Sequence, residues 1–128
     1  REKPMVDDYL DRTFGQLPSV DWRMCSAMPL PALLNHAVLH IAFDSSTVIE
    51  AGWMGIRTAL LNKELFPGGN RDGYYIHERN LGLATVLPQD VNIIKQWIEE
   101  NINKERMQSS LIDHRNSLQE FIDEIVSR

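Results

Sequence analysis

The sequence predicts an α/β protein in which a parallel sheet is covered by helices. Short apolar runs typical of buried strands occupy residues 38–43, 56–62 and 81–88. Segments with helical patterns separate these runs and follow the last of them. Because strands that alternate with helices form parallel βα units, we expect a Rossmann-like, three-layer parallel sheet with helices on both faces.

The chain before residue 38 is predicted to add two helices and one more strand. Apolar side chains recur at roughly helical spacing within residues 5–14, which indicates a helix. Residues 19–27, SVDWRMCSA, alternate apolar and polar side chains and therefore predict a strand. Residues 29–37 begin with prolines placed to start a short helix.

The chain after residue 43 is predicted to contain three helices and one long loop. A helix is expected over residues 45–55, with Gly55 at its C-terminal stop. Residues 63–80 form a loop that is long for a compact domain, and such loops are usually functional. Helices follow over residues 89–103 and 105–128. The last helix places these apolar residues near one face: Met107, Leu111, Leu118, Phe121, Ile122 and Ile125.

Length and composition restrict the class of protein. The 128 residues suit one domain, over residues 1–128, that is large enough to bury a core. A net charge of -5 argues against a nucleic-acid-binding surface. The single cysteine, Cys25, forms no internal disulfide, so a reducing, cytoplasmic setting is expected. The chain opens at Arg1 rather than at a methionine, which favours excision from a longer protein.

The turn Asp44-Ser45-Ser46-Thr47, between the strand 38–43 and the next helix, is the strongest candidate for a ligand site. In parallel sheets, ligands bind beyond the carboxyl ends of the strands, and free N–H groups at a helix start favour an anion. Glu50 lies one turn after Ser46 on the same helix face, where its carboxylate can accept hydrogen bonds from a ribose diol. A structural alternative stays open, because serines commonly begin helices and an acid in the first turn complements the helix dipole.

The same stretch resembles the C-terminal, nucleotide-sugar-binding domain of glycosyltransferases with the GT-B architecture. The matching residues are Ser45, Ser46, Thr47, Glu50, Ala51, Gly55, Ile56 and Thr58. The resemblance extends over about residues 19–100 and is closest to enzymes of surface-glycan assembly. Arg57 departs from the family, which usually has proline there.

The resemblance implies a function and a set of contacts. Ser45, Ser46 and Thr47 are expected to bind the donor phosphates, and Glu50 the ribose. The chain would be a donor-binding domain, truncated at its start, of an enzyme that transfers a sugar from a nucleotide sugar to a glycan or lipid-linked acceptor. The N-terminal acceptor domain would lie outside this chain or in a partner subunit, so the chain alone would be inactive. Peripheral membrane association is compatible with the full-length enzyme.

The loop 63–80 holds further candidates for contacts with the donor. In the family the corresponding loop faces the donor, which implies contacts by Arg71, Tyr74, His77 and Arg79. His36 and His40 are spaced like a metal pair but fall in different elements, so structural roles are favoured, and neither a metal site nor a cofactor is expected.

Two other functions keep the same fold. Non-hydrolysing nucleotide-sugar epimerases share the spacing of the serines and the glutamate. A non-catalytic, nucleotide-responsive interaction module also fits. The sequence identifies neither the catalytic residues nor the sugar and base of the donor.

Overall fold

The computed structural model describes residues 3–127, and all of their side chains except those of residues 3, 4 and 111–118. It groups the chain into two compact units, Arg1–Leu33 and Leu34–Arg128. Each unit is described by itself below.

The first unit is helical. The expected first helix is α1, Lys3–Phe14. The strand predicted over residues 19–27 is wrong, because Arg23–Ala27 forms the short helix α2. The backbone N–H of Met24 donates to the carboxylate of Asp21 at 3.2 Å, which is a typical helix-start contact. The alternating pattern therefore belongs to a helix entry that Asp21 supports. The next helix, α3, spans Leu30–His36 and reaches into the second unit.

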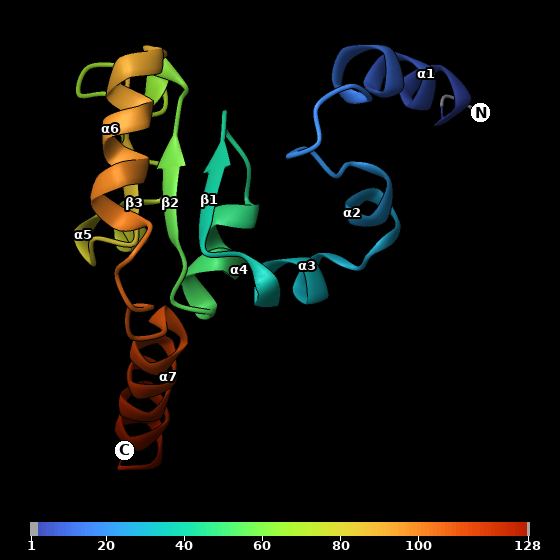
Figure 1. The fold of residues 1–128 in the computed structure, drawn as a ribbon. Coiled ribbons are helices and arrows are strands. Elements are labelled where there is room, and N and C mark those ends of the chain that lie inside the picture. Colours follow the sequence, from blue (N-terminus) through green and yellow to red (C-terminus); the bar gives the residue numbers. More distant parts are fainter. Residues whose placement is uncertain (1–2, 128) are drawn as a thin grey trace. The chain divides into compact units, whose positions relative to one another are not determined.

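The second unit contains a three-stranded, all-parallel sheet with flanking helices, as predicted in its class (Figure 1). The strands lie in the order β1-β2-β3, which is also their order along the chain. Their bounds are Leu39–Ala42, Arg57–Leu60 and Ala84–Val86. The remaining elements are α4, Thr47–Trp53; the 3-10 helix η1, Lys63–Leu65; α5, Ile76–Asn80; α6, Val91–Asn101; and α7, Ser110–Val126.

The helices lie on both faces of the sheet. Figure 1 shows α6 in front of β3, and α4 and α5 behind the strands. Cross-strand partners share a face, so the register Ala42↔Leu60↔Val86 places these three side chains together. They pack with Val48 of α4 and Leu65 of η1 in the buried core.

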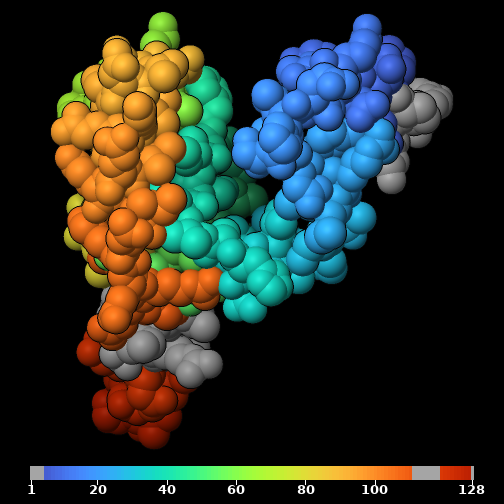
Figure 2. All heavy atoms as spheres, viewed as in Figure 1, coloured from blue at the N-terminus to red at the C-terminus, as the bar shows by residue number. Residues whose placement is uncertain are grey.

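Two predicted segments differ in detail from expectation. The loop predicted over residues 63–80 is interrupted by η1 and α5. The apolar stripe expected on the last helix is not buried where the structure describes it, since Phe121, Ile122 and Ile125 are exposed. Leu111 and Leu118 lie outside the described side chains. Figure 2 shows α7 (red) extending away from the sheet of its unit.

The start of α7 is nonetheless fixed to the sheet unit by a close backbone approach. Gly55 has φ 71°, a left-handed conformation that favours glycine. Its carbonyl accepts from the N–H of Met107 at 2.9 Å. A Cβ at this position would lie 2.0 Å from the carbonyl oxygen of Met107, so any side chain here would force the two segments apart.

Candidate functional site

The predicted Ser turn lies where a ligand site of a parallel sheet is expected. β1 ends at Ala42, and α4 begins at Thr47, so Ser45 and Ser46 occupy a strand-to-helix turn at the carboxyl edge of the sheet. The N–H of Asn62, just after β2, donates to the carbonyl of Phe43 at 2.9 Å. This bond joins the ends of the two strands and brings the residues that follow them to one edge.

The hydroxyl groups of the turn are partly used inside the protein. Ser45 Oγ accepts from the N–H of Thr47 at 3.3 Å and from its hydroxyl at 3.0 Å. Thr47 Oγ1 also lies 3.2 Å from His40 Nε2, and His40 Nδ1 lies 3.0 Å from Oγ1 of the buried Thr58. The side chain of Ser46 makes no capping bond and is exposed. Of the two serines, Ser46 is therefore the more accessible one.

The His40 ring contacts Thr58 of the sheet and Thr47 of α4. Both of its nitrogens lie within hydrogen-bonding distance of threonine hydroxyls, so neither is directed at His36. Burial lowers the pKa of His40 below its ordinary value. The neutral ring therefore links β1, β2 and the first turn of α4.

The first N–H groups of α4 have local acceptors. Besides the Thr47 bond to Ser45 Oγ, the N–H of Val48 donates to the Ser45 carbonyl at 3.2 Å and that of Ile49 to the Ser46 carbonyl at 2.9 Å. Free N–H groups were expected at this helix start. An anion at this edge would consequently depend more on side chains than on the helix start.

Glu50 stands on α4 one turn after Ser46 and is half-buried. Its Oε2 is buried and accepts no hydrogen bond from any group in the described part of the chain. A buried polar atom without a partner costs about 1–3 kcal/mol, so a donor supplied by a ligand would be stabilising here. The ribose role of Glu50 stays a prediction, and this oxygen is its main structural support.

Asp44, the first residue of the predicted turn, has a role that was not predicted from the sequence. Its side chain is 9% exposed and gathers three donor side chains from the chain after β2. Asn62 Nδ2 donates to Oδ2 at 2.9 Å, and the Tyr75 hydroxyl donates to Oδ1 at 2.9 Å. Arg71 approaches both oxygens, with Nε 2.7 Å from Oδ2 and Nη2 3.3 Å from Oδ1. The Nε–H is not aimed at Oδ2, so that contact is mainly ionic.

These contacts keep Asp44 ionised. Burial raises the pKa of the Asp44 carboxyl, but the hydrogen bonds from Asn62 and Tyr75, with the charge and hydrogen bond of Arg71, outweigh burial and hold the pKa below its ordinary value. Burial and the neighbouring Asp44 carboxylate raise the pKa of Tyr75, so its hydroxyl stays a donor. The position of Asp44, between a buried strand and two serines, was the available signal for this role.

The loop after β2 is shaped to deliver these donors. The Asn62 Oδ1 accepts from the N–H of Glu64 at 3.0 Å, which turns its Nδ2 toward Asp44. Tyr75 has φ 57° and ψ 30°, a left-handed conformation that costs a non-glycine residue about 1–2 kcal/mol. Strain of this kind concentrates at functional sites.

The four predicted loop contacts have different surroundings. The Arg71 guanidinium lies 4.1 Å from the centre of the Tyr74 ring, so these two residues form one unit beside Asp44. Arg79 donates to the carbonyls of Asp72 and Tyr74 at 2.6 and 3.4 Å and lines an open groove beside β3. His77 is half-buried on α5. Arg71 and Tyr74 are thus linked to the Ser turn through Asp44, and the ligand roles of all four stay predictions.

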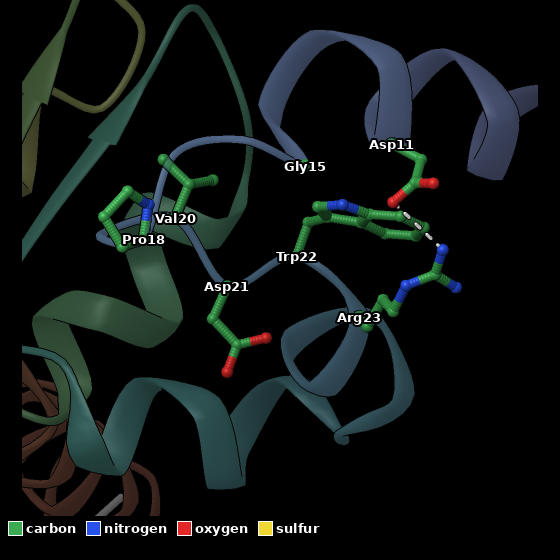
Figure 3. Close-up of a pocket in the computed structure, with 7 residues that line it drawn as sticks. All are labelled: Asp11, Gly15, Pro18, Val20, Asp21, Trp22 and Arg23. Carbon is green, nitrogen blue, oxygen red and sulfur yellow. Dashed lines mark ion pairs between the residues drawn. The ribbon is translucent and has the colours of Figure 1, made fainter.

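The first unit has a hollow of its own. It is lined by Asp11, Gly15, Pro18, Val20, Asp21, Trp22 and Arg23 (Figure 3). Arg23 pairs with Asp11 at 3.1 Å and lies 4.4 Å from the Trp22 ring centre. The side chains of Arg23 and Asp11 are 65% and 55% exposed, so their contact is an ordinary surface ion pair.

Among the side chains that the structure describes, no group of three metal-binding residues occurs. Within the same part of the chain, no helix combines the length and apolar character needed to cross a bilayer.

The fold and the site together define a small α/β domain with a three-stranded parallel sheet and a polar cluster at its carboxyl edge. Comparisons of the chain with protein-family models, with curated proteins and with solved structures find no match.

Proposed function

We propose that this chain is the donor-binding half of a GT-B-type glycosyltransferase that moves a sugar from a nucleotide sugar to a glycan or lipid-linked acceptor. The observation that carries the proposal is the buried, unpartnered Oε2 of Glu50, one turn beyond a serine turn at the carboxyl edge of a parallel sheet. This is the edge at which open parallel sheets bind ligands.

In this proposal the ribose diol donates hydrogen bonds to Glu50. The exposed Ser46 hydroxyl and the half-buried Ser45 and Thr47 hydroxyls face the donor phosphates. Binding of the phosphates would stabilise the charge that develops on the leaving group as the sugar departs. A second domain or a partner subunit would supply the acceptor and the general base.

A panel of nucleotides and nucleotide sugars in a thermal-shift assay tests the proposal on the 128-residue chain. A ligand that binds only the folded state stabilises it by RT ln(1 + L/Kd), where L is the free ligand concentration, and so raises the melting temperature. We expect nucleoside diphosphates and nucleotide sugars to stabilise the wild type. Glu50→Gln should lower their affinity about tenfold, because charge-assisted hydrogen bonds to the ribose are lost.

Glu99→Gln is the matched control. Glu99 lies on α6, its side chain is 66% exposed, and its only described ion pair is a 4.0 Å contact with Lys95. The same charge change there should leave nucleotide affinity unaltered. Equal affinities for wild type, Glu50→Gln and Glu99→Gln would contradict the ribose role, and an absence of stabilisation by every nucleotide would contradict the proposed function.

A further inference from the structure

The Arg71 guanidinium is held in place by two neighbouring side chains. Asp44 engages one edge of the guanidinium plane through Nε and Nη2, and the Tyr74 ring covers one face at 4.1 Å. The backbone N–H of Arg71 is fixed as well, by a 2.9 Å bond to the Glu64 carbonyl. Fixing a binding group in advance lowers the entropy lost on association, so this arrangement suits a receptor for a ligand.

The guanidinium also has donors to spare. An arginine carries five N–H donors, and only Nη2 makes a hydrogen bond to Asp44 here. Nη1 takes no part in the contacts with Asp44, and the side chain is 38% exposed. A planar edge with parallel N–H groups is the geometry that carboxylates and phosphates accept in pairs.

The surroundings of the Ser turn require such a cation if an anion is to bind. Asp44 and Glu50 bring two negative charges to this end of the sheet, and the first N–H groups of α4 already have acceptors. Lys63, the other basic residue just after β2, is exposed and has no described side-chain partner. Arg71 is therefore the one positioned cation beside the turn in the described part of the chain.

We propose that Arg71, positioned by Asp44 and Tyr74, binds a phosphate group at the carboxyl edge of the sheet. The identity of the ligand as a nucleotide rests on the proposed function, but the anion site itself does not require a nucleotide. Asp44 is a positioning residue: it aims the guanidinium and neutralises it when no ligand is bound.

Inorganic pyrophosphate is the probe for this site. Titration of the 128-residue chain, followed by calorimetry, should show binding to the wild type that falls about tenfold or more in Arg71→Gln, because charge-assisted hydrogen bonds are removed. Lys63→Gln is the matched control, with the same loss of charge just after the same strand, and its affinity should stay within about twofold of the wild type. Equal losses in the two variants, or no loss in Arg71→Gln, would overturn the proposal, as would a wild type that does not bind pyrophosphate.

A second measurement avoids any dependence on how well the variant folds. The side-chain ¹⁵N–H signals of Arg71 in the wild type should shift on addition of pyrophosphate, with those of Arg57 as an internal reference. Arg57 donates to the Glu105 carbonyl at 2.8 Å and should not respond. Unshifted Arg71 signals at saturation would overturn the proposal.

Failure of this inference and failure of the proposed function give different results. If nucleoside diphosphates bind tightly and lose affinity in Glu50→Gln but not in Arg71→Gln, the proposed function is supported and the Arg71 site is contradicted. If pyrophosphate binds through Arg71 and nucleoside diphosphates bind no more tightly than pyrophosphate, the anion site is supported and a nucleotide ligand is contradicted.

Discussion

Residues 39–50 and residues 62–75 meet at the same edge of the sheet but obtain their structure in different ways. The first segment is a strand, a turn and a helix, and its turn and helix start are held by local contacts, such as Ser45 with Thr47. The second is a loop whose main polar contacts reach back over 18 to 31 residues to Asp44. A local pattern can be recognised in a sequence, whereas a long-range cluster depends on which strand ends become neighbours.

The largest effect on stability is expected from a substitution in the buried core, which supports both segments. Leu60 is fully buried in β2, the middle strand, which pairs with β1 and with β3. Leu60→Ala should lower the free energy of unfolding by about 2–5 kcal/mol, from lost burial and the cavity left behind. Urea unfolding measures this, and a loss below about 1 kcal/mol would show that this core does not support the fold.

The comparison explains which parts of the fold were predictable. The strands after residues 37, 55 and 80 were recognised from their apolar runs, which are typical of parallel strands. The first run was expected to be buried, but Val38, Ile41 and Phe43 are exposed. Residues 19–27 were wrongly predicted as a strand from their alternating pattern. They pair with no strand, and the contact of Asp21 with Met24 supports a helix instead. The spacing along the last helix placed its apolar residues near one face, but helical spacing alone does not show whether a partner covers that face.

The candidate site also has one part that local sequence determines and one part that depends on strand pairing. The turn Ser45–Ser46 and the one-turn spacing to Glu50 follow from local sequence, and their placement at the carboxyl edge is as predicted. The role of Asp44 could not be predicted, because its partners Asn62, Arg71 and Tyr75 become neighbours only when β1 pairs with β2.

A substitution at Asp44 tests the long-range contacts of the loop separately from the local contacts of the turn. Asp44→Ala leaves the donors of the loop without their common acceptor but keeps the local turn. We expect a loss of about 1–3 kcal/mol in the free energy of unfolding, since the removed carboxylate was nearly buried. Asp8→Ala, which removes a carboxylate that is 66% exposed and pairs with Arg12, should cost less than about 0.5 kcal/mol. Similar losses for the two variants would show that the Asp44 cluster is only a surface ion pair.

The smallest expected effect is a dependence of stability on pH that originates in the local segment. The folded-state pKa of His40 lies below its unfolded value, so the unfolded chain binds more protons as the pH falls. The contribution of His40 is therefore complete above the ordinary pKa near 6.5 and is lost as the pH falls toward the lowered, folded-state value. Unfolding free energies at pH 7 and pH 5 should differ less in His40→Gln than in the wild type. An equal pH dependence in both would show that His40 is not the group responsible.

The central claim is that Glu50 holds the ribose of a nucleotide, and a double-mutant cycle tests it most directly. Calorimetry would compare a nucleoside diphosphate with its 2′,3′-dideoxy analogue on the wild type and on Glu50→Gln. The account predicts that the dideoxy analogue binds the wild type about tenfold more weakly, yet loses little more on the variant, because both changes remove the same hydrogen bonds. Losses that simply add would show that the carboxylate and the diol do not interact.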